Sequence, residues 1–182
     1  LEDVLPVSAK KYLVLRKGIL ELQNTQTDAV QFLALVKIGL RHNRNREWWQ
    51  AGNVFRHAFS LLKGLWPEDT FCSEKAVSFN SQLISSLSKA TIAWAGIMNR
   101  SGDIDGAINL VEKILHIHFD DERLISLLYS LYLKSKNRLK AREILERYRT
   151  ALQRQGYSAE EIEELQQEII SFSLRKMEEE GY

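Results

Sequence analysis

A spacing of 34 residues repeats along the second half of this chain and restricts its fold more than any other feature. On one helical face, a small residue is followed by apolar residues four and seven positions later. The pattern occurs at Ala107, Val111 and Ile114, and again at Ala141, Leu145 and Tyr148, with a third instance at Ala51, Phe55 and Ala58. The preceding segments keep the same register, because Trp94 corresponds to Leu128 and Met98 to Tyr132. A small residue in this position lets two helices approach closely, so the repeat predicts stacked helical hairpins.

This period and its small residue resemble the tetratricopeptide repeat. Gly102-Asp103 before the second helix of one unit, and Phe119-Asp120-Asp121 after it, also resemble that repeat, with Phe119 in place of the usual proline. The sequence therefore predicts an all-α, tetratricopeptide-like, right-handed array of about seven helices, with a short N-terminal β segment. A generic helical bundle with accidental spacing is the alternative.

Local signals divide the chain into elements. Residues 12–22 read as two short strands around a Lys17-Gly18 turn. Asp28 is expected to cap the first helix, and residues 43–45 to end it. Further helices are predicted over about residues 47–63, 73–99, 104–118, 121–135, 139–155 and 158–180. Asp120 or Asp121 is expected to cap the helix that ends near residue 135. Ser158 and Glu161 have the spacing of a capping box that opens the last one.

Composition excludes several classes of protein. The 182 residues fit one domain, and 25 basic against 24 acidic residues give a net charge of +1, unlike a domain that grips DNA. The single cysteine, Cys72, and the lack of a signal peptide or membrane-length apolar run predict a cytoplasmic protein. His116 and His118 lie two apart and point apart on a helix, so no metal site is expected. We predict no cofactor and no enzymatic activity.

The order of motifs resembles a known family. Residues 27–32 follow the two predicted strands. Next come a helix pair, a turn at residues 61–68 that contains Trp66-Pro67, a long helix and two repeats. The series ends with Gly156-Tyr157-Ser158. This succession, over roughly residues 12–170, is similar to the bacterial transcriptional activator domain, which adjoins a winged-helix DNA-binding domain in regulators such as the antibiotic regulatory proteins of streptomycetes. The chain lacks two prolines that this family often has, near Phe119 and near Ser158.

The resemblance implies a domain organisation and a role. Residues 1–24 would be a remnant of, or linker from, an upstream winged helix, and residues 25–182 the helical domain with a C-terminal capping helix. The chain, which starts at Leu1, would be a fragment of a regulator. It would mediate self-association, for example as a homodimer, or it would contact other regulator domains or the transcription machinery. No direct contact with nucleic acid or membrane is expected. The alternative is a stand-alone tetratricopeptide adaptor that binds an acidic peptide or C-terminus.

The adaptor hypothesis rests on the first helix of each pair, which lines the concave groove in such arrays. The candidate partner-binding residues are Asn43, Arg44, Lys89, Asn99, Arg100, Arg123 and Lys134. Other groove-facing positions in the same register include Val36, Ile92, Ser126 and Ser130. Amide donors and cations suit a carboxylate. The competing interpretation is that these are solvated helix-surface charges and residues favoured at helix C-termini by the dipole.

The adjacent Trp48 and Trp49 cannot both face one core. One of them is expected at a seam or on the surface, where tryptophan favours interfaces. Cover of the second by the N-terminal strands is the alternative.

Overall fold

A computed structural model describes residues 13–16, 19–22, 27–62, 74–117 and 121–179. Strands β1 (Leu13–Arg16) and β2 (Ile19–Leu22) pair antiparallel, with Leu13 opposite Leu22, which confirms the expected short strands. The predicted Trp66-Pro67 turn, Cys72, His118 and the Phe119 motif lie outside the described residues.

Seven helices occupy the rest of the described residues, as predicted. They are α2 (Asp28–Arg44), α3 (Trp48–Ser60), α4 (Glu74–Arg100), α5 (Ile104–Ile117), α6 (Glu122–Lys134), α7 (Arg138–Arg154) and α8 (Ala159–Glu179). The expected boundaries hold to within one or two residues, except that α3 ends at Ser60, short of residue 63.

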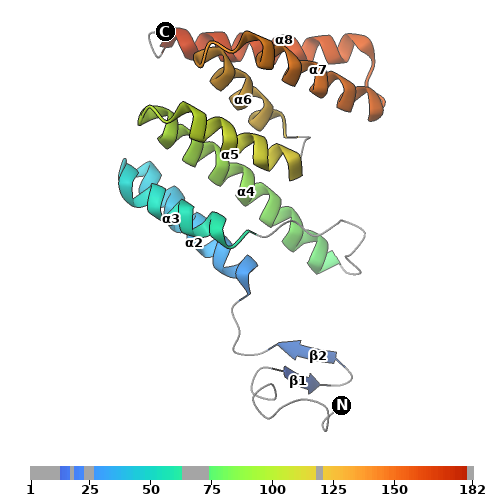
Figure 1. Cartoon of the computed structure of the whole chain (residues 1–182). Helices are drawn as coiled ribbons and strands as arrows, with labels where there is room; N and C mark the ends of the chain where they lie inside the picture. The colour runs from blue at the N-terminus through green and yellow to red at the C-terminus, as the bar shows by residue number, and fades with distance from the viewer. Residues whose placement is uncertain (1–12, 17–18, 23–26, 63–73, 118–120, 180–182) are drawn as a thin grey trace.

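The helices stack as hairpins, with α2 against α3, α4 against α5 and α6 against α7 (Figure 1). Each first helix also packs on the next first helix, from α2 to α4, α4 to α6 and α6 to α8. Helix α8 therefore takes the place of the first helix of a fourth pair. It packs on α7 as well, and its residues Glu160, Glu163, Glu164 and Gln167 are exposed.

The small residues of the repeat lie in the core, as the register predicted. Ala51, Ala107 and Ala141 are at most 2% exposed. Gly39 adds a close contact that the repeat pattern did not include: a β-carbon there would lie 2.6 Å from Cε1 of Phe55. Trp94 is partly buried against the core, its ring centroid 5.0 Å from that of Phe59.

The turns inside the three pairs share one geometry. Arg46, Gly102 and Lys136, at equivalent positions, all have positive φ values of 61°, 85° and 59°. The next amide in each turn donates to the carbonyl five residues earlier: Glu47 to His42 (3.0 Å), Asp103 to Met98 (2.9 Å) and Asn137 to Tyr132 (2.8 Å). This hydrogen bond satisfies a carbonyl that the helix end would leave unpaired. The repeat is thus a repeat of backbone geometry as well as of sequence.

The helix caps correct one expectation and confirm two. Thr27, not Asp28, caps α2: its hydroxyl accepts a hydrogen bond from the Val30 amide at 3.3 Å, and Asp28 is the first helical residue. Asp121 caps α6. At α8 the Ser158 amide donates to Glu161 at 2.8 Å and the Glu161 amide to the Ser158 hydroxyl at 3.2 Å, the predicted capping box.

The tryptophan pair separates as expected. Trp49 is 78% exposed, whereas Trp48 is partly covered by the guanidinium of Arg100, 4.3 Å from its ring centroid. None of the described helices is long and apolar enough to cross a lipid bilayer.

Candidate functional site

A cavity of about 700 Å³ opens between three of the first helices, α4, α6 and α8. Its lining residues come mainly from α6 and α8. They are Ile92 from α4; Glu122, Arg123, Ser126, Leu127 and Ser130 from α6; and Gln167, Glu168, Ile169, Ser171, Phe172 and Arg175 from α8. We call this cavity the α6–α8 pocket. Its volume is within the range of ligand sites in proteins, roughly 300–1,000 Å³.

Ser126 lies in this pocket with an unsatisfied hydroxyl. The residue is 8% exposed, and its Oγ has no hydrogen-bond partner among the described residues. Its carbonyl, in contrast, accepts from the hydroxyl of Ser130 at 2.9 Å and from that of Ser173 at 3.4 Å. A buried hydroxyl without a partner costs free energy. The hydroxyl oxygen itself is buried, so its unpaired state is a cost borne inside the fold beside the pocket.

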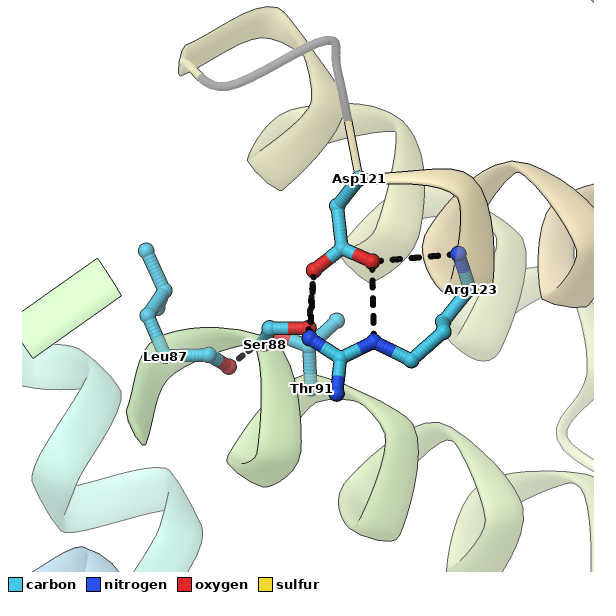
Figure 2. Close-up of polar contacts among 5 residues, drawn as sticks. All are labelled: Leu87, Ser88, Thr91, Asp121 and Arg123. Carbon is cyan, nitrogen blue, oxygen red and sulfur yellow. Dashed lines mark hydrogen bonds and ion pairs between the residues drawn. The ribbon is translucent and has the colours of Figure 1, made fainter. Parts of the chain in front are cut away.

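A polar cluster fixes one side of the pocket to α4 (Figure 2). The Asp121 carboxylate accepts from the Arg123 backbone amide at 3.0 Å, from Arg123 Nε at 3.2 Å and from Arg123 Nη2 at 3.1 Å. The Ser88 hydroxyl of α4 donates to the same carboxylate and accepts from Arg123 Nη2 at 3.3 Å. Arg123 is thereby folded back over the start of its own helix.

The Asp121 side chain is only 8% exposed, and its charge is compensated locally. Burial acts to raise the pKa of this carboxyl, but the hydrogen bonds from Arg123 and Ser88 outweigh it and hold the pKa below its ordinary value of 3.8. Asp121 and Arg123 thus form a nearly neutral pair at the edge of the pocket. Such a pair contributes less attraction for an anionic ligand than a free arginine would.

The expected partner-binding residues have different surroundings in the structure. Of the seven candidate partner-binding residues, Arg123 lines the α6–α8 pocket. Arg100 lies over Trp48, and Lys134 makes an interaction within the fold. Arg44 and Lys89 are exposed on α2 and α4, away from the pocket lining.

The two expected amides have a different environment. Asn43 and Asn99 each have a buried Oδ1 without a hydrogen-bond partner among the described residues. Val36, expected to face the groove, is 2% exposed and belongs to the core, so that expectation is wrong. Ile92, Ser126 and Ser130, from the same register, do line the pocket.

Sequence reasoning missed the contribution of α8, which supplies Gln167, Glu168, Ile169, Ser171, Phe172 and Arg175. Helix α8 had been expected to close the array as a cap. The signal that could have identified this wall is Phe172, a large apolar residue that the helix leaves 54% exposed. Within the described part of the chain, no group of three or more histidine, cysteine, aspartate or glutamate residues could hold a metal ion.

Comparison with known protein families gives a match that covers most of the helical array. A family model described as the bacterial transcriptional activator domain matches residues 27–170, from the cap of α2 into α8. No curated protein matches the chain significantly.

Proposed function

The chain belongs to the bacterial transcriptional activator domain family, and on that premise we propose that it is the protein-interaction domain of a bacterial transcriptional regulator. In this role the domain associates with a second copy, receives a signal from another domain, or contacts the transcription machinery. It does not read DNA itself, which accords with the balanced charge of +1.

The observation that carries the proposal is the open pocket built from successive first helices of the array. In helical repeat proteins, stacked pairs create extended concave surfaces that bind other proteins. The conspicuous polar cluster, Ser88 with Asp121 and Arg123, is satisfied internally and joins α4 to α6. This cluster therefore stabilises the packing of the two helices. The surface that remains for a partner consists mainly of other side chains of the pocket.

A deletion in the intact regulator tests the proposal. Removal of residues 27–179 should abolish activation of a target promoter in a reporter strain, while operator binding by the remaining protein, measured by gel shift, is retained. A bacterial two-hybrid screen of the chain against itself and against RNA polymerase subunits should identify a pairing. Full activation without the helical array would contradict the proposal.

The stand-alone adaptor for an acidic peptide is the second hypothesis. Of its cations, Arg123 lines the pocket, and Asp121 already pairs with that side chain. No other observation favours it, so we rank it below the regulator domain.

A further inference from the structure

The helical array ends on a first helix that has no second helix of its own among the described residues. Helix α4 packs on α2, α3, α5 and α6, and helix α6 packs on α4, α5, α7 and α8. Helix α8 packs on α6 and α7, at the C-terminal end of the array (Figure 1). Part of the surface of α8 beside α7 therefore lacks the cover that the inner first helices have.

Two rows of side chains lie along the contact between α7 and α8. Gln166 of α8 donates to the Leu145 carbonyl of α7 at 2.9 Å, and both residues are half-buried. On α7, Arg142 and Arg149 are three and four residues from Leu145, so they belong to the same row. On α8, Glu163 is three residues from Gln166 and extends the row on that helix. We call the exposed residues of these two rows and beside them the α7–α8 face: Arg138, Leu139, Arg142 and Arg149 of α7, and Glu160, Glu163 and Leu174 of α8.

The two helices of this face carry opposite charge, although the whole chain is nearly balanced at +1. Helix α7 has six basic against two acidic residues, a net charge of +4, and α8 has seven acidic against two basic residues, a net charge of −5. None of the charged side chains of the α7–α8 face forms a hydrogen bond or an ion pair with another described residue. Their charges are therefore not compensated by direct contacts within the described part of the chain.

The contact between α7 and α8 also sets the level of each residue along the face. The two helices are joined by residues 155–158 and run in opposite directions (Figure 1). From the bonded pair toward this turn, Arg149 is four residues away on α7 and Glu163 three residues away on α8. In the other direction, Leu139 is six residues away and Leu174 eight, and these side chains are 70% and 48% exposed. At 1.5 Å per residue, each of these two pairs is level to within about 3 Å.

A face with this arrangement is complementary to itself. A two-fold rotation about an axis parallel to the helices places α7 of one copy opposite α8 of the other and keeps every level along the helices. Arg149 then faces Glu163 of the second copy, and Leu139 faces Leu174 of the second copy. A partner of different sequence would need an acidic and a basic helix side by side in the reverse order, which a second copy already provides.

We propose that two copies of this chain form a reciprocal dimer through the α7–α8 face. The 17 residues of α7 extend about 25 Å and each helix is about 10 Å wide, so each copy buries about 500 Å². The total of about 1,000 Å² lies at the lower limit for a specific interface, so the dimer is reversible. No residue of the face lines the α6–α8 pocket, which stays open in the dimer. This inference rests on the proposed function and names a second copy as the partner.

Sedimentation velocity of the purified 182-residue chain tests the association. We expect monomer and dimer in equilibrium, with a dissociation constant of about 1–100 µM. An increase in salt from about 0.05 M to about 0.5 M should weaken the dimer at least about fivefold, because exposed charge pairs are screened. A chain that remains monomeric at several hundred micromolar in low salt contradicts the proposal, and so do open-ended assemblies larger than the dimer.

Two charge-reversed variants test the contact itself. Arg142→Glu with Arg149→Glu places acid opposite acid, and Glu160→Arg with Glu163→Arg places base opposite base. Each variant alone should dimerise at least about tenfold more weakly than the parent. An equimolar mixture of the two variants should dimerise like the parent, because both contacts of the mixed dimer again join opposite charges.

Controls separate the charge contact from folding and from net charge. Lys37→Glu with Lys75→Glu makes the same change in net charge at exposed residues of α2 and α4, and should leave dimerisation unchanged. Circular dichroism and urea denaturation check that each variant is folded. The single changes Arg149→Glu and Glu163→Arg repeat the mixing experiment without altering the first turn of α8.

Two further results would overturn the inference. One is a dimer that the charge reversals leave unchanged, which would lie on another face of the molecule. The other is a pair of folded, reversed variants that remain monomeric when mixed. Neither result bears on the proposed function, because the deletion experiment measures promoter activation whichever partner the domain contacts.

Discussion

The residues that end the first helix of each pair share a left-handed backbone although their side chains differ. Gly102 adopts this conformation without a steric penalty, whereas Arg46 and Lys136 have a β-carbon that crowds the backbone. The three turns keep the same hydrogen bond, so geometry and not residue type is common to them. Two of the three turns therefore store strain.

Lys136→Gly should relieve this strain. We expect the free energy of unfolding to rise by about 1 kcal/mol, because a non-glycine residue in the left-handed region costs roughly 1–2 kcal/mol, part of which the greater freedom of glycine in the unfolded chain offsets. Urea denaturation measures the change. Gly102→Ala is the matched control and should lose a similar amount; a gain there would contradict the explanation.

A second effect at the residue scale is the acid sensitivity of Asp121. Its pKa in the folded chain lies below the ordinary 3.8, so the ionised carboxylate contributes stability that is complete above that pH and is lost as the pH falls through the folded-state pKa. Asp121→Asn keeps a capping side chain but removes the charge.

The variant should be less stable than the parent by about 1–2 kcal/mol at pH 7, since hydrogen bonds to a charged group are lost. The gap should shrink between pH 4 and pH 2. Urea titrations at pH 7, 4 and 2.5 measure it. An undiminished gap at the lowest pH would show that the charge of Asp121 is not responsible.

At the scale of elements, the closest helix approach in the first pair depends on the absence of a side chain. A β-carbon at Gly39 would lie 2.6 Å and 2.8 Å from two ring carbons of Phe55, which is itself fully buried. The spacing of α2 and α3 is therefore set by these two residues.

Gly39→Ala should lower the free energy of unfolding by about 1–3 kcal/mol, the usual cost of overpacking. Gly52→Ala in α3 is the control, since a β-carbon there meets no atom within 4 Å. It should stabilise the chain by up to about 1 kcal/mol through helix propensity alone. Thermal and urea unfolding measure the stability of both variants. If the two substitutions change the free energy of unfolding in the same direction, the explanation is wrong.

The elements were predictable where local chemistry marks them. The capping-box spacing of Ser158 and Glu161 predicted the start of α8, and the alanines at positions 107 and 141 predicted the packed helix faces. The wall that α8 gives to the pocket was not predictable from the register. Ser158 follows Asp121 by 37 residues (121 to 158), so the last helix falls out of the 34-residue spacing. The unpaired state of Ser126 likewise depends on what surrounds it in three dimensions.

Across the whole molecule, each pair packs mainly on its neighbours, from α2 to α8. The stability of such an array is approximately a sum over units and their interfaces. A change at one end should therefore be felt locally, unlike a change in a single central core.

Ile169→Ala tests this at the C-terminal end, because Ile169 is 2% exposed on α8. The lost packing is worth about 2–5 kcal/mol. Hydrogen exchange should accelerate in α6, α7 and α8 and stay close to the parent rates in α2 and α3. Equal acceleration throughout would mean that the array opens as one cooperative unit.

The origin of the pocket walls has a mechanical consequence. Ile92, Ser126 and Phe172 belong to three successive layers. A rotation of one layer against the next would therefore change the width of the cavity. A ligand bound between these layers would resist that rotation, and the C-terminal end of the helical array would become stiffer. Occupancy would then be transmitted as curvature, without a hinge or a moving loop.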